Sequence, residues 1–471
     1  MIEEQVPEGN LSQQNNLPEQ ESGKDKVVSQ INARTKIIEI LTKVETRQAF
    51  TDKLLDREID ELNEMDRSLV TEVVNGVLRW QYRLDWILSQ LYVGEYENLI
   101  PDVKNNLRAS TYQLIYLDQI PAYAVLNEAV EIAKNKFNQK TANLINAILR
   151  NFLRQQKKLE YLEMQLEVLD RMAVKFSHPK WLVQRWIEFW GIDEVEPLCE
   201  YNNSRPRISV RINRLIADNE SFLRTLEENN ISYEIHKDFP DFVWIDNFSE
   251  FRKLDFLKKG WVSVQDVSAG IPVLLLDPKP GEYILDMCAA PGGKAGYIAE
   301  KMQDHGFILA IERHFSRAKI FKDNLSRLNI NITNIVCADS LQLPTKIQFD
   351  KVLIDAPCTG FGVLNKRVDL RWKRTLQDIE NMKNIQIQLL ESAAKVVKPD
   401  GIIIYSTCTI DPEENEHVVG RFIKNNPEFS LERVNTYVPE QYLSEKKFVK
   451  TFPHKHGIDG TFAVRIRKNK N

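Results

Sequence analysis

The sequence lacks any long hydrophobic run. None of its apolar segments approaches the roughly 20 consecutive residues that a membrane-spanning helix needs. The N-terminus carries no basic stretch followed by an apolar one, so no secretory signal is recognised. These absences argue against a membrane-embedded or exported protein, and we expect a cytoplasmic one.

Cysteine is scarce, and its spacing argues against two kinds of small domain. Five cysteines occur in 471 residues, and none belongs to a C-x-x-C pair. This pattern favours neither a zinc site nor a disulfide framework, and it suits a reducing compartment. We therefore expect no metal site. The cysteines are Cys199, Cys288, Cys337, Cys358 and Cys408.

The chain also lacks an excess of positive charge, with a formal net charge of −4. Net charge is a poor guide to nucleic-acid binding, however, because phosphate contacts depend on local clusters. Residues 203–214 hold four arginines and no acid, and residues 366–374 hold five basic residues and one acid. Solvated surface charge is the alternative for either segment. The candidate RNA contacts are Arg207, Arg211, Lys366 and Arg371.

Composition and periodicity divide the chain into four parts. Residues 1–31 are polar with few large apolar groups, and we expect a disordered tail there. In residues 32–160 apolar side chains recur at helical spacing, which predicts an all-α domain. Residues 161–259 are interpreted as a linker and a small α/β domain. From residue 260 to residue 471 strands and helices alternate, which predicts a mostly parallel sheet.

The periodicity also places individual elements. In the small α/β domain we expect strands near Ile208, Tyr233 and Val243, and the Trp-rich segment 181–190 is expected to pack in a core. In the last part the predicted strands are 283–288, 307–312, 332–338, 349–355 and 401–407, with helices at 316–328 and 376–397.

Several strings in the helical part are distinctive. They are MDRSLV (65–70), EVVNGVLR (72–79), LRASTYQLIY (107–116), IPAYAVLNEAV (120–130) and NLINAILRNFLR (143–154). Together they make this part similar to the transcription-antitermination factor NusB, and the resemblance implies a helical RNA-binding bundle. The alternative is a generic bundle that serves only as an interaction scaffold.

A loop of small residues follows the first predicted strand of the last part. Small residues let a ligand approach the backbone, and free N–H groups at the start of a helix favour a carboxylate. The loop is not a G-x-G-x-x-G dinucleotide signature, and it is not a phosphate-binding G-K-[ST] loop because Ala295 follows the lysine. Its residues are Cys288, Ala289, Ala290, Pro291, Gly292, Gly293 and Lys294.

Acids end the next two predicted strands. Glu312 is placed to accept from two ribose hydroxyls, and Asp339 to accept from an adenine amino group. Either acid could instead be a helix cap.

Two cysteines and a carboxylate end the remaining strands. Asp355 and Cys358 follow one strand and Cys408 follows the other, so all three are expected at one rim of the sheet. This set fits methylation of cytosine at carbon 5, because a thiolate that adds at carbon 6 makes carbon 5 nucleophilic. A carboxylic group near the ring N3 would stabilise the developing charge. A helix that starts near residues 411–413 would lower the pKa of Cys408.

The residues alone leave two points open. They do not decide which thiol is the nucleophile, and cysteine is commonly a small buried hydrophobe. An adenine-N6 or other amino methyltransferase would use a motif of the Asn/Asp-Pro-Pro-Tyr type. Asp355-Ala-Pro-Cys358 lacks the aromatic residue of that motif and supplies a thiol instead, so this class is disfavoured.

The last part resembles the family of RNA cytosine-C5 methyltransferases that depend on S-adenosylmethionine. With the NusB-like part it is similar to the RsmB (Sun) type, so the resemblance implies a class I methyltransferase fold and a cytidine of small-subunit (16S) ribosomal RNA as target. It implies that the Cys288-to-Lys294 loop, Glu312, Asp339 and Asp355 hold the cofactor. Cys408 would then be the nucleophile, and Cys358 would assist product release.

The sequence leaves the oligomeric state open, and a monomer is the default. Neither a metal nor a membrane partner is expected. The rival substrates are transfer RNA and another ribosomal-RNA site, and the rival function is a non-catalytic RNA-binding or antitermination factor. Val368 and Asn365 depart from the family pattern, at a proline and a basic position respectively, and put the local RNA contacts in doubt.

Overall fold

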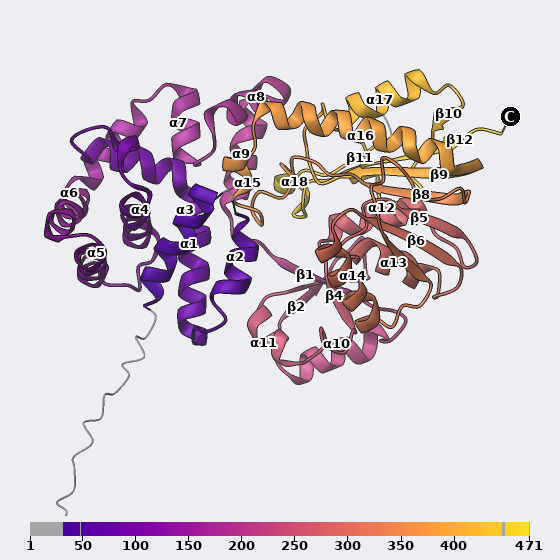
Figure 1. Ribbon diagram of the computed structural model, residues 1–471, viewed down its shortest axis with the longest axis horizontal. Coiled ribbons are helices and arrows are strands. Elements are labelled where there is room, and N and C mark those ends of the chain that lie inside the picture. Colours follow the sequence, from indigo (N-terminus) through magenta and orange to yellow (C-terminus); the bar gives the residue numbers. More distant parts are fainter. Residues whose placement is uncertain (1–31, 48, 445–447, 471) are drawn as a thin grey trace, which may run out of the picture.

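The computed structural model describes residues 32–47, 49–444 and 448–470. The tail predicted for residues 1–31 lies outside the described residues. The described chain contains a helical domain, a small α/β domain and a large α/β domain, as the sequence predicts (Figure 1).

The helical domain owes its fold to amphipathic helices that share two apolar clusters. Valines at helical spacing on α3, including Val70, Val73 and Val77, are fully buried in one cluster. The N-terminus of α3 is capped because the Asn63 side chain accepts a hydrogen bond from Asp66 N. The helices are α1 (Ala33–Arg47), α2 (Thr51–Glu58), α3 (Glu64–Leu91), η1 (Tyr96–Asn98), α4 (Pro101–Tyr116), α5 (Ala122–Lys136) and α6 (Gln139–Met164).

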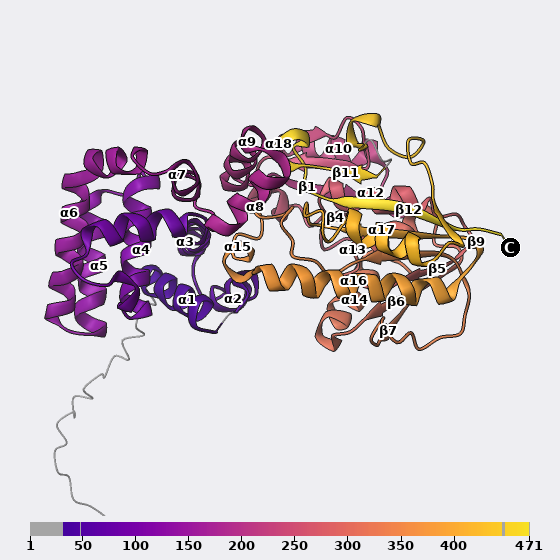
Figure 2. The ribbon, with the colours of Figure 1, turned by 90° about the horizontal axis from the view of Figure 1, so that it is seen from above.

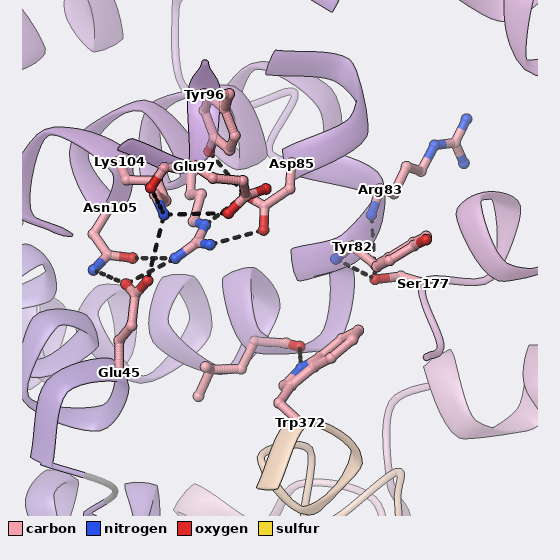
Figure 3. A network of polar contacts seen from close by, with 12 residues as sticks. Glu45, Tyr82, Arg83, Asp85, Tyr96, Glu97, Lys104, Asn105, Ser177 and Trp372 are labelled. Atoms are coloured by element: carbon pink, nitrogen blue, oxygen red, sulfur yellow. Dashed lines mark hydrogen bonds and ion pairs between the residues drawn. The ribbon is translucent and has the colours of Figure 1, made fainter. Parts of the chain in front are cut away.

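A buried polar network fixes how these helices meet (Figure 3). Arg108 on the central helix α4 donates to both carboxylate oxygens of Asp85 at 2.6 and 2.7 Å. It also donates to Glu45 at 3.0 Å, so α1, α3 and α4 share one guanidinium. A buried charge is tolerated only when it is paired in this way.

Three helices connect the helical domain to the rest: α7 (Val168–Lys175), α8 (Lys180–Trp190) and α9 (Ile192–Asn203). Trp186 on α8 is fully buried and meets Phe361 edge to face, with ring centroids 6.4 Å apart. The Trp-rich segment therefore packs in a core, which confirms its interpretation.

The small domain is an antiparallel sheet with two helices. Its strand order is β2-β3-β1-β4. The elements are β1 (Ile208–Ile212), α10 (Asn219–Glu228), β2 (Tyr233–Ile235), β3 (Phe242–Ile245), α11 (Phe248–Lys253) and β4 (Val262–Val264). Strand β4 pairs with β1, so the small sheet takes in residues that follow the predicted start of the last part at residue 260.

The large sheet has the order β10-β12-β9-β8-β5-β6-β7, with β11 paired to β12. Strands β5 to β9 run parallel, and β12 returns antiparallel to β9. Its strands are β5 (Tyr283–Asp286), β6 (Phe307–Glu312), β7 (Thr333–Cys337), β8 (Phe349–Asp355), β9 (Val397–Thr407), β10 (Phe429–Leu431), β11 (Val449–Lys450) and β12 (Phe462–Lys468). These observed strands confirm the fold class that the alternation predicts.

Helices cover both faces of this sheet (Figures 1 and 2). Alternate strand residues supply the two cores: Ile284 packs on the side of α12, α13 and α14, and Leu285 on the side of α16 and α17. The helices are α12 (Val267–Leu276), α13 (Gly293–Lys301), α14 (Phe315–Arg327), α15 (Leu370–Lys373), α16 (Leu376–Val396), α17 (Glu416–Asn425), η2 (Glu440–Tyr442) and α18 (Pro453–His456).

The order of strands reverses between β5 and β8. A crevice forms outside the carboxyl ends of the strands at such a point, and ligands bind there in open α/β sheets.

Candidate active site

A cavity of about 680 Å³ lies at the carboxyl edge of the large sheet. Loops that follow β5, β6, β7, β8 and β9 line it, and so do the segment 363–374 and Phe50 of the helical domain. The predicted site residues that line it are Cys288, Ala290, Glu312, Asp339, Asp355, Cys358, Lys366 and Cys408. The topology thus brings together residues that lie far apart in the sequence.

The small-residue loop leads directly into α13, which begins at Gly293. Gly292 has φ +101°, and a Cβ there would lie 2.2 Å from the Phe321 ring, so no other residue fits. Burial raises the pKa of the Cys288 thiol. That thiol is therefore unreactive, and the loop can offer a ligand its backbone N–H groups and small surface.

Asp286 stands immediately before this loop, and the sequence reasoning did not single it out. Its side chain is 1% exposed, and neither carboxylate oxygen has a hydrogen-bond partner among the described residues. Burial and the nearby Asp355 carboxylate raise its pKa to about 7. A buried carboxylate without a partner is costly, so a cation from outside the chain would be stabilised beside it. The sequence signal that could have identified Asp286 is its position at the end of a strand-like run.

Glu312 and Asp339 lie at the ends of β6 and β7, as predicted, but neither caps a helix. Glu312 accepts from His314 N at 2.8 Å, two residues along the chain, while His314 itself is the N-cap residue of α14. Asp339 accepts from Leu341 N at 3.0 Å in a turn. Both carboxylates line the cavity, with Arg317 3.4 Å from Glu312 and Arg313 3.7 Å from Asp339.

The two thiols face each other. Cys358 Sγ and Cys408 Sγ are 3.2 Å apart, and both cysteines are free. The hydrogen bond with Cys408 and burial raise the pKa of Cys358 well above its ordinary value. Cys358 therefore stays protonated, and its S–H can donate to the sulfur of Cys408.

Lys294 and Asp355 form the polar side of the same rim. Lys294 Nζ lies 2.6 Å from Asp355 Oδ2, and Ser406 Oγ donates to Asp355 Oδ1 at 3.2 Å. Burial opposes the charge on Lys294, but Asp355 and, more weakly, Cys408 raise its pKa. A fixed ammonium group thus lies within electrostatic reach of the nucleophile candidate.

Glu414 is a second residue that sequence reasoning missed. It is fully buried and accepts hydrogen bonds from Thr359 N at 2.9 Å, from Thr359 Oγ1, and from Gln386 Nε2 at 3.0 Å. Burial raises its pKa to about 7. Gln386 also donates to the carbonyl of Pro357 at 2.9 Å, so this network holds the backbone on both sides of Cys358.

Two of the four predicted RNA contacts are wrong. Arg211 is 1% exposed and pairs with Glu300 across the boundary of the two α/β domains. Arg371 is fully buried and donates to backbone carbonyls. Because both are buried, neither guanidinium can reach a phosphate. The prediction failed because the charge density of a segment does not reveal which side chains point inward.

Arg207 and Lys366 keep part of their surface exposed. Arg207 stacks on Trp244 at 4.0 Å and pairs with Glu234. Lys366 lines the cavity and pairs with Asp266 and Asp459.

The helix predicted to start near residues 411–413 begins at Glu416 instead, because residues 412–415 form a turn.

The described residues contain neither a cluster of metal ligands nor a membrane-spanning helix. No group of three or more His, Cys, Asp or Glu side chains there is arranged to hold a metal ion. No helix within the same residues is long and apolar enough to cross a membrane.

Three family models match successive parts of the chain. Residues 31–154 match the NusB family, and residues 178–251 match a ferredoxin-like domain of RsmF/B-like methyltransferases. Residues 273–467 match the model described as 16S rRNA methyltransferase RsmB/F.

Curated relatives match this chain over most of their own length. A Bacillus subtilis (strain 168) protein named "Probable ribosomal RNA small subunit methyltransferase B" is 33% identical over 92% of this chain and 97% of its own length. A Cronobacter sakazakii protein named "Ribosomal RNA small subunit methyltransferase B" is 32% identical over 85% of this chain and 92% of its own length.

Solved structures agree with these matches. The crystal structure of PH0851 superposes with a TM-score of 0.78 at 27% identity, covering 93% of this chain and 99% of its own. A methyltransferase homologue from Pyrococcus horikoshii covers 64% of this chain and 100% of its own, with a TM-score of 0.55 and 30% identity.

Proposed function

Because the chain belongs to the RsmB/F family of 16S rRNA methyltransferases, we propose that it methylates carbon 5 of a cytidine in small-subunit ribosomal RNA. The observation that carries this proposal is the pair of free thiols 3.2 Å apart at a cavity that Asp355 also lines. Methylation of an exocyclic amine or of a ribose hydroxyl has no use for two thiols, whereas carbon 5 chemistry needs one to activate the ring.

The methyl donor in this proposal is S-adenosylmethionine, which supplies an electrophilic methyl group on a sulfonium. Residues that line the cavity, and others next to its lining, fit this donor. The unpaired buried carboxylate of Asp286 suits a cationic group, and the N–H groups at the start of α13 suit a carboxylate. Glu312 would accept from the ribose hydroxyls and Asp339 from the adenine amino group.

The chain's own residues then act on the base. Cys408 Sγ adds to carbon 6, forming an S–C6 bond and moving the ring's electron pair to carbon 5. The Asp355 side chain accepts a hydrogen bond from the exocyclic amine, and the Lys294 ammonium that pairs with it offsets the negative charge that builds on the ring. After carbon 5 has gained the methyl group, a base removes its proton, and the S–C6 bond breaks to restore the aromatic ring.

The role of Cys358 follows from its protonation. Cys358 holds its proton, so it is suited to protonate the departing sulfur of Cys408 and release the product. The buried Glu414 network fixes the backbone around Cys358 and is a positioning element.

The cysteine roles make a direct prediction. We expect Cys408→Ala to lose methyl transfer by at least about 10³-fold while retaining cofactor binding, because the attacking atom is missing. We expect Cys358→Ala to accumulate a protein–RNA adduct that survives a denaturing gel. The measurements are bisulfite mapping of ribosomal and transfer RNA, and electrophoresis of enzyme incubated with RNA.

Each alternative has its own outcome in this experiment. An adduct in Cys408→Ala but not in Cys358→Ala would reverse the two roles. If a transfer-RNA cytidine becomes resistant to bisulfite conversion, transfer RNA is the substrate in place of ribosomal RNA. If no cytidine becomes resistant, the result supports an RNA-binding factor without catalysis. The proposal also includes a monomeric cytoplasmic enzyme whose catalytic domain begins after β4 and not at residue 260.

A further inference from the structure

Phe50 is an aromatic side chain of the helical domain that lies at the catalytic cavity. It precedes α2 as the N-cap residue, and its side chain is among those that line the cavity with Cys358 and Cys408. It is 45% exposed. A single exposed apolar residue on a protein surface needs no explanation, but an exposed ring inside a cavity that binds a nucleobase does.

The backbone on both sides of Phe50 is held by the segment 367–373 of the large domain. The carbonyl of Ala49 accepts from Lys373 Nζ at 2.6 Å, and Thr51 N donates to Asp369 Oδ2 at 3.3 Å. Asp52 pairs with Arg367 at 3.1 Å. Contacts at Ala49, Thr51 and Asp52 thus fix the chain around Phe50, which stays 45% exposed.

The segment 367–373 is itself firmly anchored. Val368 is 2% exposed and packs in the apolar cluster of the helical domain. Trp372 Nε1 donates to the carbonyl of Leu78 at 2.5 Å (Figure 3). The fully buried Arg371 reaches carbonyls on α3 and α9. The segment that holds Phe50 is therefore anchored in both the helical and the large domain.

Cations surround the ring of Phe50. Lys373 Nζ lies 4.6 Å from the ring centroid and Lys53 Nζ lies 5.8 Å from it. Arg367 and Arg374 line the same cavity. Acids pair with these cations: Arg367 with Asp52, Lys373 with Asp369, and Lys366 with Asp459. An aromatic face flanked by cations matches a nucleobase followed by its phosphate.

We propose that Phe50 stacks on an unpaired base of the RNA next to the target cytidine. The inference rests on the proposed function, because it assumes that a cytidine enters the cavity from an RNA strand. A base that leaves its stack to be modified leaves neighbours without a stacking partner. An aromatic ring at the mouth of the cavity replaces that partner and holds the strand in register with Cys408.

Stacking makes a quantitative prediction for binding. We expect Phe50→Ala in a Cys408→Ala background to weaken the affinity for the RNA that the wild-type enzyme methylates by about 10-fold or more, since base–aromatic stacking contributes on that scale. Phe50→Trp should retain the affinity. Affinity for S-adenosylmethionine and the melting temperature should stay at their parental values. Fluorescence anisotropy of labelled RNA, calorimetry and thermal denaturation measure the three quantities.

A matched control comes from the same domain. Tyr123 on α5 is 72% exposed and does not line the cavity, so Tyr123→Ala should leave RNA affinity unchanged. With otherwise wild-type cysteines, Phe50→Ala should raise KM for RNA more than it lowers kcat.

The outcomes separate the two proposals. If the wild-type enzyme methylates a cytidine but Phe50→Ala binds RNA as tightly as its parent, the stacking role is refuted and the function stands. If Phe50→Trp is as weak as Phe50→Ala, a stacking platform is also refuted. If the wild-type enzyme methylates no cytidine, the proposed function itself has failed.

Discussion

The carboxylate of Asp286 is buried at the end of β5 without a hydrogen-bond partner among the described residues. Its pKa of about 7 means that the folded chain binds a proton there more tightly than the unfolded chain does. Since that pKa lies above the unfolded value of about 4, stability is lost as the pH rises from about 4 to about 7. A cationic ligand would pull the pKa down again and recover that loss.

This gives a prediction for Asp286→Asn. The variant has no group to ionise, so its melting temperature relative to the wild type should rise as the pH is increased from about 4 to about 7 and then level off. Its affinity for S-adenosylmethionine at pH 8 should fall by about 10-fold or more, because a charged hydrogen bond is lost. Thermal scans across pH and calorimetry test both parts, and a flat difference in melting temperature together with unchanged affinity would refute them.

At the scale of elements, the segment that contains α15 joins three parts of the molecule. Arg371 donates to the carbonyls of Arg79, Ser177 and Asn202, and to the side chain of Asn203 at 2.9 Å. Burial and the nearby Arg79 lower its pKa to about 9, which leaves the guanidinium charged at neutral pH. A segment rich in positive charge thus serves mainly to bind backbone carbonyls.

The role of Arg371 can be tested by its removal. Arg371→Met leaves at least three buried carbonyls without a donor, so we expect a loss of about 3–5 kcal/mol in stability and a lower kcat, because the neighbouring residues line the cavity. Arg371→Lys should recover part of the stability. The exposed Arg224, replaced by Met, serves as the control and should change stability by less than about 0.5 kcal/mol. Thermal denaturation and methylation kinetics decide, and a fully stable, fully active Arg371→Met would contradict this role.

At the scale of the whole molecule, the helical and catalytic domains share a core contact. Val368 of the large domain belongs to the apolar cluster of the helical domain, and Phe50 of the helical domain lines the catalytic cavity. Each domain therefore contributes a side chain to the other: Val368 to the helical core and Phe50 to the catalytic cavity. A helical domain that only gripped RNA from a distance would need neither contact.

The shared contact predicts cooperative unfolding. We expect the helical and catalytic domains of the wild-type chain to melt in one calorimetric transition, and Val368→Asp to split it, because a charge would be buried in the helical cluster. Val93 is 97% exposed, so Val93→Asp is a control that should keep one transition. Two well-separated transitions in the wild-type protein would show that the contact does not couple the domains.

Local sequence patterns determine many of the strands and loops of this molecule. The sequence predicts strand β8 at its observed limits, 349–355, and it predicts a loop of small residues that leads into the helix observed as α13. Alternation of strands and helices determines a parallel sheet, and a parallel sheet brings the residues after its strands to one rim. Asp355, Cys358 and Cys408 could therefore be expected together before any contact was known.

The tertiary structure alone decided the direction and partners of each side chain. Arg211 and Arg371 look like surface charges in the sequence, yet both are buried, because burial depends on segments that lie far along the chain. Asp286 and Glu414 gain their raised pKa values from the same enclosure. Phe50 lines the cavity with the thiols only because Val368, Arg371 and Trp372 bind the helical domain, and no local pattern encodes the proximity of residues so distant in sequence.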